Sequence, residues 1–427
     1  GRPDLGTRGA LGARAMIALL RLRESLVLES ALLGVSVVLA RLAAHRLAST
    51  RAARRTVAAV ALLVVGALVA WGALPRPFAS YGVDVAMALL PLLGLLCLSL
   101  VPSVLVGRAL NRLLLAPAVS IDPRGGEPTA KAVEADVPRE PRPARRAVVA
   151  MATLALPAAG LGAGVAGFVT GAALPRTRRV RMDFPRLPQE LAGLRILQLS
   201  DLHLGCTRRL DDLERFLASA DRPDLLMLTG DVAEDLSLLA PALHMIAALK
   251  PRLGAFACLG NHEHFHGAAS ARRIFERSDI DLLVNDARTV AVGDARLAIL
   301  GVDDPVWMRG DLRPRLARHL DGALQRAGGE ADFRLLMSHR PEGFDPAHAR
   351  GVDLVLSGHT HGGQIGFHEK SVGERLWPER YLWGPYSRGD SRLYTTAGFG
   401  DWYPWRPGCP SEAALVELTH SKRCCVG

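Results

Sequence analysis

The sequence predicts an α/β domain of two packed sheets, preceded by an α-helical membrane region. Two observations support this division of the 427 residues. Before about residue 176, Ala, Leu, Val and Gly dominate and acidic residues are few, whereas the remainder has the mixed charge of a soluble domain. From residue 191 onward, short apolar runs alternate with amphipathic helical patterns, which is typical of a largely parallel sheet.

Three stretches of the first 175 residues are long and apolar enough to cross a bilayer as helices. Residues 56–75, 85–107 and 147–175 carry no charged side chain, and each reaches the roughly 20 residues that a spanning helix needs. A fourth stretch, 26–40, is shorter and contains Glu29, so it is either a first spanning helix or an amphipathic segment on the membrane surface. We therefore expect three or four transmembrane helices in residues 1–175.

The arginines between these stretches predict the side of the membrane on which each connection lies. Residues 41–55 contain five arginines and residues 108–146 are again rich in arginine, whereas 76–84 contain one cation and one acid. Because basic connections stay in the cytoplasm, the chain after Pro175 is expected outside it. The arginines between Arg176 and Arg181 favour the opposite orientation. We expect a multi-pass protein of the bacterial cell membrane, with the lipid bilayer as a partner and an extracytoplasmic C-terminal domain.

Two segments without periodicity are predicted to be linkers. Residues 121–143 form a disordered linker between membrane spans, and residues 176–190 lead into the soluble domain of residues 191–420, which is followed by a tail of residues 421–427. The net charge is +10 and the pI is about 9.8. Because the arginines concentrate beside apolar spans and not in a basic patch interleaved with aromatics, no nucleic acid is expected as a partner.

Eight apolar runs of the C-terminal part predict β-strands. The runs over 194–199, 225–228 and 255–259 are followed by helical patterns over 210–217, 238–249 and 269–277. Such alternation places the carboxyl ends of parallel strands along one edge of a sheet. The later runs have fewer helices between them and predict a second sheet packed on the first, with strands over 297–301, 333–337, 354–356, 393–396 and 414–418.

Side chains that bind metal ions follow five of these runs. They are two carboxylates, one carboxamide and four imidazoles: Asp201, His203, Asp231, Asn261, His339, His359 and His361. Seven ligands are too many for one ion but suit two divalent ions that share a carboxylate. Such a pair lowers the pKa of water and neutralises phosphate oxygens, so the set predicts phosphoryl chemistry.

The same residues resemble the signature of the calcineurin-like metallophosphoesterases. The motifs, in the family's order, are Asp201-x-His203, Gly230-Asp231, Gly260-Asn261-His262-Glu263, His339 and Gly358-His359-Thr360-His361. The flanking Gly362-Gly363-Gln364, Gly301-Val302-Asp303-Asp304, Ala397-Gly398-Phe399-Gly400, Arg406 and Pro410-Ser411-Glu412 resemble the bacterial membrane-linked branch. The resemblance covers roughly residues 192–420 and implies an αββα two-sheet sandwich.

The resemblance also implies a role for each residue. One ion would be held by Asp201, His203 and His361, the other by Asn261, His339 and His359, and Asp231 would bridge them. His262 would be catalytic, contacting the scissile phosphate or protonating the leaving oxygen. The ligand set leaves the identity of the two divalent ions open among Mn, Fe, Zn, Co and Ni.

Three features near these motifs have more than one interpretation. His264 and His266 either shape the substrate pocket or are exposed loop histidines. Asp303 and Asp304 either support the metal ligands or close a turn. The aromatic residues clustered within 377–405 either form an apolar lip facing lipid or pack into the core.

The predicted function is that of a membrane-anchored dinuclear-metal phosphoesterase. It would hydrolyse a phosphodiester or phosphomonoester, in a lipid or cell-envelope molecule or in a soluble one, by attack of a metal-bridging hydroxide. The alternative is a catalytically silent membrane sensor or scaffold that retains the fold. The presence of every expected ligand and of His262 favours the enzyme. The sequence leaves the oligomeric state open.

Overall fold

The computed structural model describes residues 155, 159, 160, 162–306, 310–375, 381–401 and 405–420. The chain divides into two compact units, residues 1–165 and 166–427. The predicted segments over 26–40, 56–75, 85–107, 121–143 and 421–427 lie outside the described residues, as does part of 147–175. Among the residues described, no helix combines the length and the apolar character that a membrane crossing requires.

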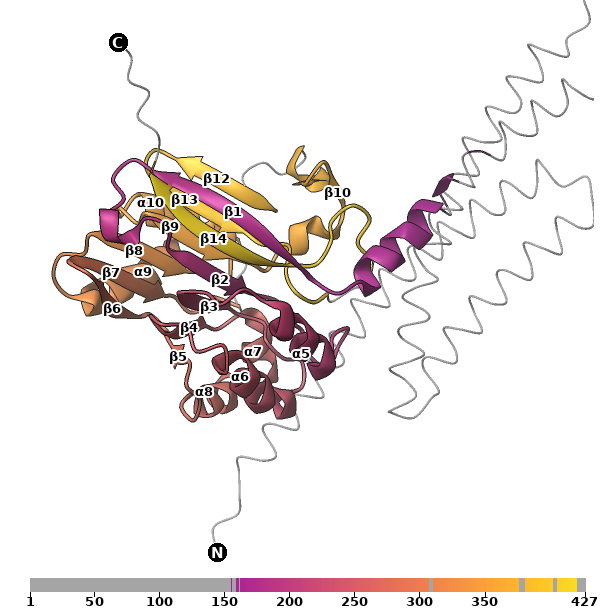
Figure 1. Ribbon diagram of the computed structural model, residues 1–427, viewed down its shortest axis with the longest axis horizontal. Helices are drawn as coiled ribbons and strands as arrows, with labels where there is room; N and C mark the ends of the chain where they lie inside the picture. Colours follow the sequence, from indigo (N-terminus) through magenta and orange to yellow (C-terminus); the bar gives the residue numbers. More distant parts are fainter. Residues whose placement is uncertain are drawn as a thin grey trace, which may run out of the picture. The chain divides into compact units, whose positions relative to one another are not determined.

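The first sheet of the second unit has six strands in the order β1-β14-β2-β3-β4-β5 (Figure 1). Strands β2 to β5 run parallel, as predicted, and β14 is antiparallel to β2. Every residue of β3 and β4 is buried, which explains their uninterrupted apolar sequences. The strand bounds are Arg176–Phe184 for β1, Arg195–Leu199 for β2, Leu225–Thr229 for β3, Ala255–Cys258 for β4, Asp281–Leu282 for β5 and Glu412–His420 for β14.

Strand β1 corrects the prediction that residues 176–190 are a linker. Arg176–Phe184 pairs in parallel with β14 along its whole length, so the first sheet of the second unit begins directly after Pro175. Val180, Met182 and Phe184 are buried and alternate with exposed residues, which is the period of a half-buried strand. The frequent arginines on the other face hide this period in the sequence.

The second sheet also has six strands, in the order β12-β13-β9-β8-β7-β6. Strands β13, β9, β8 and β7 run parallel, and the two outer strands are antiparallel to their neighbours. The run over 414–418 was predicted in this sheet, but it forms β14 of the first sheet. The strand bounds are Asp286–Val292 for β6, Ala295–Gly301 for β7, Phe333–Met337 for β8, Leu354–Ser357 for β9, Gly384–Arg388 for β12 and Ser391–Thr395 for β13.

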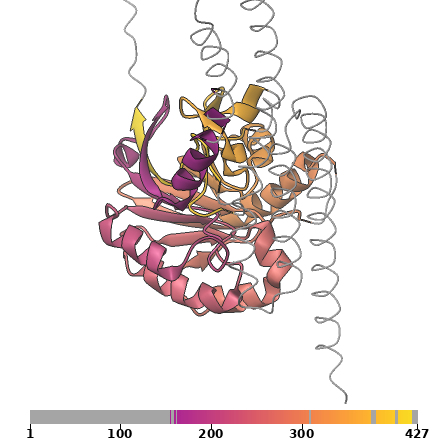
Figure 2. The same cartoon turned by 90° about the vertical axis from the view of Figure 1, so that its right-hand side faces the viewer.

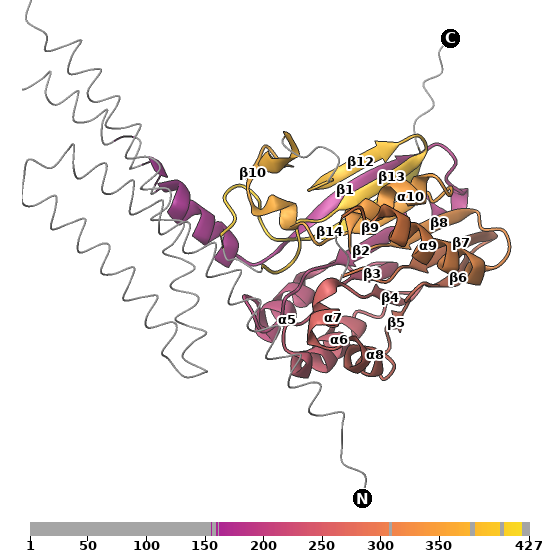
Figure 3. The same ribbon diagram turned by 180° about the vertical axis from the view of Figure 1, so that it is seen from behind.

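Helices cover the outer face of each sheet. Figure 2 shows helices along the outer face of the first sheet. Leu213 and Phe216 of one of them share a buried cluster with strand residues such as Leu226. On the second sheet, Figure 3 shows helices such as α9 along the outer face. Leu316 and Leu320 of this helix are part of a buried cluster with strand residues. The helix bounds are Leu210–Ser219 for α5, Leu239–Ala247 for α6, Asn261–His266 for α7, Ala268–Phe275 for α8, Arg313–Ala327 for α9 and Phe344–His348 for α10. A short hairpin, β10 (Gly366–Phe367) with β11 (Lys370–Ser371), follows the last predicted ligands.

The core between the sheets joins their inner faces. Ile196 and Met227 of the first sheet share one buried cluster with Ile299, Leu335 and Tyr394 of the second. Burial of each such side chain contributes about 1.5–3 kcal/mol relative to exposure. The two mixed sheets with outer helices form the predicted αββα sandwich, and the sandwich brings the carboxyl ends of strands from both sheets to one place.

Candidate dinuclear metal centre

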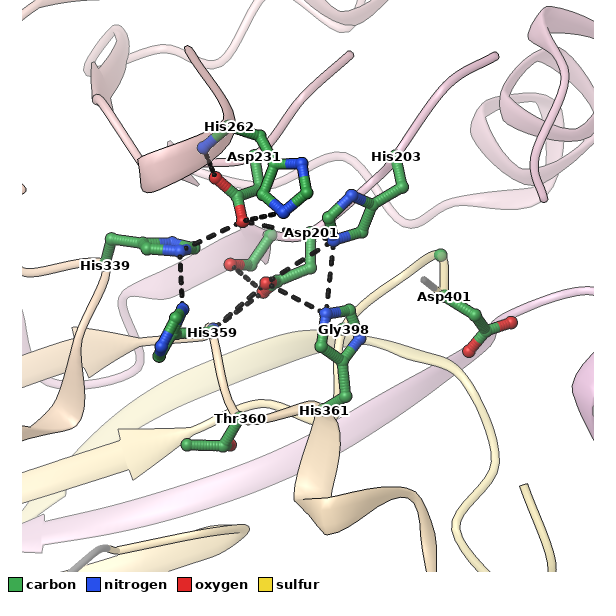
Figure 4. Close-up of polar contacts among 12 residues, drawn as sticks. Asp201, His203, Asp231, His262, His339, His359, Thr360, His361, Gly398 and Asp401 are labelled. Carbon is green, nitrogen blue, oxygen red and sulfur yellow. Dashed lines mark hydrogen bonds and ion pairs between the residues drawn. The ribbon is translucent and has the colours of Figure 1, made fainter. Parts of the chain in front are cut away.

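All seven predicted ligands lie beyond the carboxyl ends of strands. Six of them point toward one another in Figure 4. The seventh, Asn261, has its Oδ1 atom 3.1 Å from Nε2 of His339. Asp201 and His203 follow β2, and Asp231 follows β3. Asn261 is the first residue of α7, close after β4. His339 follows β8, and His359 and His361 follow β9. The prediction that the residues following these strands lie close together is therefore confirmed. Their assignment as metal ligands remains a proposal.

A first donor set consists of Asp201, His203 and His361. One ligand atom from each lies within 4.8 Å of the others. The Nε2 atoms of His203 and His361 are 3.1 Å apart, and Nε2 of His361 is 3.5 Å from Oδ1 of Asp201. All three side chains are buried.

A second donor set consists of Asn261, His339 and His359. Nε2 of His339 lies 3.1 Å from Oδ1 of Asn261 and 3.2 Å from Nδ1 of His359. One amide oxygen and two imidazole nitrogens converge, and such donors suit borderline divalent ions.

Asp231 lies between the two donor sets. Its Oδ2 is 3.1 Å from Nε2 of His339 in the second set and 4.0 Å from Nε2 of His203 in the first. Its Oδ1 accepts the backbone N–H of His262 at 2.8 Å, which fixes the orientation of the carboxylate. One carboxylate oxygen is thus placed to serve both sets, and the donor chemistry fits a pair of divalent ions.

Hydrogen bonds on the far side of two rings determine which nitrogen faces the centre. Nδ1 of His339 donates to the carbonyl of Thr229 at 2.8 Å, and Nδ1 of His203 lies 2.7 Å from the Glu234 carboxylate. In both rings Nε2 is left for a metal ion, as is usual for metal-binding histidines. Burial lowers the pKa of His339, but the Asp231 carboxylate outweighs it and raises that pKa to about 10. A metal ion must therefore displace a proton from this ring.

The backbone of the site is strained at the ligands themselves. Five of the seven have a positive φ: Asp201, His203, Asp231, His359 and His361, between 46° and 69°. Non-glycine residues rarely adopt this conformation, and such strain concentrates at functional sites. Gly358 allows the close approach, because a Cβ there would collide with the side chains of Ser200 and Asp201. The N–H of His359 donates to that Asp201 carboxylate at 3.0 Å.

Glu263 fixes the loop that carries Asp231. Its buried carboxylate accepts the backbone N–H groups of Gly260, Asp231 and Val232 at 2.7–3.0 Å. The sequence motif contained Glu263 but gave it no role. This carboxylate joins the end of β3 to the start of α7, and so holds two ligand loops together.

Glu234 is a functional residue that sequence reasoning missed. Its carboxylate contacts Nδ1 of His203, Nδ1 of His262 and Nε2 of His266. Burial raises its pKa, but the hydrogen bonds from these three rings outweigh burial and lower it overall. The sequence feature that could have indicated Glu234 is its position three residues after Asp231, in the same loop after β3.

The open alternatives near the motifs are now decided in part. His264 and His266 are not exposed loop residues, because they lie half-buried on α7 and bond Asp303 and Glu234 at 2.8 and 2.7 Å. Asp304 does more than close a turn, since it accepts Nε–H of Arg340 at 2.8 Å, directly beside the second donor set. Of the aromatic cluster, Trp383 is buried and packs in the core.

An arginine lies behind each histidine of the Gly358–His361 motif. Nη1 of Arg340 is 2.8 Å from Nε2 of His359, and Nη2 of Arg406 is 3.0 Å from Nδ1 of His361. Arg406 is fully buried and also donates to the carbonyls of Ala397 and Gly400. The sequence included Arg406 among its flanking motifs, whereas Arg340 received no role.

Comparison with known proteins identifies the family. Residues 194–363 match the model of the calcineurin-like phosphoesterases. The chain is 32% identical to phosphodiesterase YaeI of Escherichia coli over 238 residues, which cover 53% of this chain and 83% of that protein. The chain therefore belongs to the calcineurin-like metallophosphoesterases, and this class is that of metal-dependent phosphoester hydrolases.

Two further relatives extend over less of their own length. An uncharacterized metallophosphoesterase of Helicobacter pylori is 30% identical, and the match covers 59% of this chain and 66% of the relative. A Danio rerio protein named as a transmembrane protein with metallophosphoesterase domain is 31% identical over 47% of this chain and 48% of its own. The chain thus spans between about half and two thirds of these two relatives.

Proposed function

We propose that the two donor sets hold two divalent ions and that Asp231 bridges them. The position of Asp231 Oδ2, 3.1 Å from His339 Nε2 and 4.0 Å from His203 Nε2, is the observation that carries this proposal. Bound divalent ions would neutralise phosphate oxygens and make water nucleophilic at neutral pH. Asn261 adds an oxygen ligand without adding negative charge, which favours the approach of an anionic phosphoester.

His262 is proposed to protonate the leaving oxygen. Its Nδ1 pairs with Glu234, which leaves Nε2 on the side of the centre, 3.9 Å from Oδ2 of Asp231. The side chain is 18% exposed, whereas the side chains of His203 and Asp231 are at most 2% exposed. An incoming substrate can therefore reach the His262 ring. Such a positioned acid contributes about 10²–10⁴-fold to a rate.

We further propose a phosphodiester or phosphomonoester of a lipid or cell-envelope molecule as the substrate. The Escherichia coli relative is named a phosphodiesterase, which favours a diester. The uncharged stretches over 56–75, 85–107 and 147–175 support attachment to a membrane, and the name of the Danio rerio relative is consistent with it. Phe367 of the β10–β11 hairpin is 70% exposed and Ile365 beside it 41%, so an apolar surface lies next to the last ligands.

The activity is tested with the full chain purified in detergent and loaded with Mn²⁺. The substrates are bis-p-nitrophenyl phosphate and p-nitrophenyl phosphate. Asp231→Asn should lower kcat by more than about a thousandfold, because a shared metal ligand supports several kcal/mol of charge stabilisation. Asp221→Asn is the matched control, since Asp221 forms an exposed ion pair with Arg179. A parent protein that hydrolyses neither compound would favour the silent sensor.

The proposed topology needs a separate test. We propose an extracytoplasmic catalytic unit, and a reporter fused after His420 follows the end of β14 without interrupting it. Periplasmic reporter activity is expected, and activity in the cytoplasm only would contradict the proposed orientation. Elemental analysis of natively produced protein identifies the metal ions, for which the donor chemistry allows Mn, Fe, Zn, Co or Ni.

A further inference from the structure

Arg340 occupies a distinctive position at the outer side of the second donor set. It follows His339 directly, and its side chain is 15% exposed. Its Nε–H donates to Oδ2 of Asp304 at 2.8 Å, and its Nη1 lies 2.8 Å from Nε2 of His359. The Asp304 side chain is completely buried. A buried carboxylate therefore holds a partly exposed guanidinium beside a proposed metal ligand.

The contact between Arg340 and His359 is incompatible with metal binding by His359. Nδ1 is the ring nitrogen that faces the donor set, because it lies 3.2 Å from Nε2 of His339. An imidazole that gives its Nδ1 lone pair to a cation carries its proton on Nε2. A guanidinium has donors only. When His359 is a ligand, its Nε2–H and the Nη1–H of Arg340 are two donors that face each other.

An acceptor between these two groups would remove this conflict. The two donors meet 2.8 Å apart, at a place where the Arg340 side chain is 15% exposed, and the guanidinium is positively charged. Asp304 can keep the guanidinium in place through Nε, so that the Nη groups remain available to an anion. Among the residues whose structure is described, no group bonds the buried Oδ1 of Asp304, so the arginine can also rotate against this carboxylate without losing it.

We propose that Arg340, together with the Nε2–H of His359, binds a phosphate oxygen of the substrate. This inference rests on the proposed function and names a specific phosphate contact within it. A guanidinium suits the task because its planar donors match two phosphate oxygens and it stays charged at any working pH. Arg406 does not fit the same role, because it is fully buried and bonded to the carbonyls of Ala397 and Gly400.

The test is a calorimetric titration of the metal-loaded full chain with orthophosphate, together with its metal content by mass spectrometry. Arg340→Gln should weaken orthophosphate binding by about tenfold to a hundredfold, the usual effect of losing charge-assisted hydrogen bonds. Its metal content should equal that of the parent. Arg350→Gln is the matched control, because Arg350 forms a similar pair with Asp321 at 2.6 and 3.0 Å outside the donor sets. Its orthophosphate affinity should equal that of the parent.

A second variant keeps the test valid if Arg340→Gln does not fold. The double variant Asp304→Asn with Arg340→Gln removes both charges of the pair, which is less disruptive than leaving the buried Asp304 charge unpaired. It should show the same fall in orthophosphate affinity. Affinity equal to that of the parent in either folded variant would overturn the proposal. Loss of metal ions from both variants would also overturn it, because Arg340 would then support the metal ligands and not the anion.

The two proposals fail in different ways. If the parent hydrolyses phosphoesters and Arg340→Gln binds orthophosphate as the parent does, only the role of Arg340 is wrong. If the parent hydrolyses nothing but loses orthophosphate affinity on the substitution of Arg340, the anion contact stands and the proposed hydrolysis is wrong. A parent that binds no orthophosphate would overturn the anion contact.

Discussion

Carboxylate side chains have different roles at the amino and carboxyl ends of the parallel strands. At the amino ends, three aspartates each precede a strand and accept the backbone N–H of an arginine in the neighbouring strand at 2.7–2.8 Å. The backbone N–H of each aspartate also donates a hydrogen bond to the carbonyl of that arginine at 2.9–3.0 Å. The pairs are Asp224 with Arg195, Asp332 with Arg296 and Asp353 with Arg334. The same closed ring thus ties strand pairs in both sheets, with the carboxylates still accessible to water.

At the carboxyl ends, buried acids lie close to one another. Asp201 and Asp231 are at most 2% exposed. Burial raises the pKa of Asp201, and the Asp231 charge adds to this increase against the lowering effect of His339. Positive φ angles at both aspartates add backbone strain. The amino ends therefore stabilise the sheets, whereas the carboxyl ends carry the chemistry at a cost in stability that bound ions would offset.

His262→Gln should have the largest effect, and it tests whether a residue at the carboxyl ends serves the reaction without stabilising the fold. This change should lower kcat by about 10²–10⁴-fold, because the proposed acid is lost, and should change the free energy of unfolding by less than about 1 kcal/mol. Steady-state hydrolysis of bis-p-nitrophenyl phosphate and urea unfolding measure the two quantities. His244→Gln, at an exposed position of α6, is the control. A kcat unchanged from the parent would remove His262 from the mechanism.

Arg406→Met tests whether a buried charge near the carboxyl ends can stabilise the fold. Its Nε pairs with the buried Asp401, and burial lowers its pKa to about 10. Removal of one partner of a buried pair should lower the free energy of unfolding by about 3–5 kcal/mol. The midpoint of urea unfolding measures this loss. A loss below about 1 kcal/mol would show that this carboxyl-end charge is no more important for stability than a surface ion pair.

Metal removal should affect the parent but not Asp231→Asn. A ligand at a hundred times its Kd stabilises a protein by about 2.7 kcal/mol, so a chelator should lower the thermal midpoint of the parent. Without the bridging carboxylate, Asp231→Asn should be insensitive to chelation. In chelator it should unfold at a lower temperature than the parent, because His339 loses the buried carboxylate 3.1 Å away that raises its pKa. Thermal unfolding with and without EDTA checks both points. A fall in the midpoint of Asp231→Asn on chelation as large as that of the parent would contradict the proposed bridging role of Asp231.

Most strands of the fold could be predicted because their sequences are apolar throughout. Strands β3 and β4 are buried on both faces, so their runs are visible without any partner. The strand β1 was missed because arginines on its exposed face interrupt the pattern, and β14 was assigned to the wrong sheet because strand order depends on long-range pairing. Apolar content shows that a strand exists, whereas neighbours are decided by topology.

The site residues also divide into those that the local sequence reveals and those that depend on long-range contacts. The ligands could be predicted because each stands directly after an apolar run, and parallel topology brings such positions together. Glu234 and Arg340 could not, because their roles depend on contacts with residues far along the chain. Glu234 meets His203 across 31 positions, and Arg340 meets Asp304 across 36. Each pair becomes visible only when two strands are known to be neighbours.

The smallest expected effect concerns the amino ends, where Asp224→Asn should reduce stability without changing kcat. Burial raises the pKa of Asp224, but the N–H of Arg195 and the side chain of Arg252 outweigh it and lower that pKa below its usual value. The charged form therefore stabilises the fold above the unfolded pKa of about 3.9, and this contribution is lost as the pH falls through the lower folded pKa. We expect a loss of about 1–2 kcal/mol at pH 7.

The pH dependence of Asp224→Asn distinguishes an effect of the charged hydrogen bond between Asp224 and Arg195 from a simple packing effect. The difference in free energy of unfolding between parent and variant should shrink as the pH falls below about 3.9, because the parent carboxylate then becomes protonated as well. Urea unfolding at pH 7 and at pH 3 measures it. Asp221→Asn, which breaks an exposed ion pair with Arg179, should change stability by less than about 0.5 kcal/mol at either pH. An equal loss for Asp224→Asn at both pH values would mean that shape, and not the charge accepting the Arg195 N–H, holds these strand ends together.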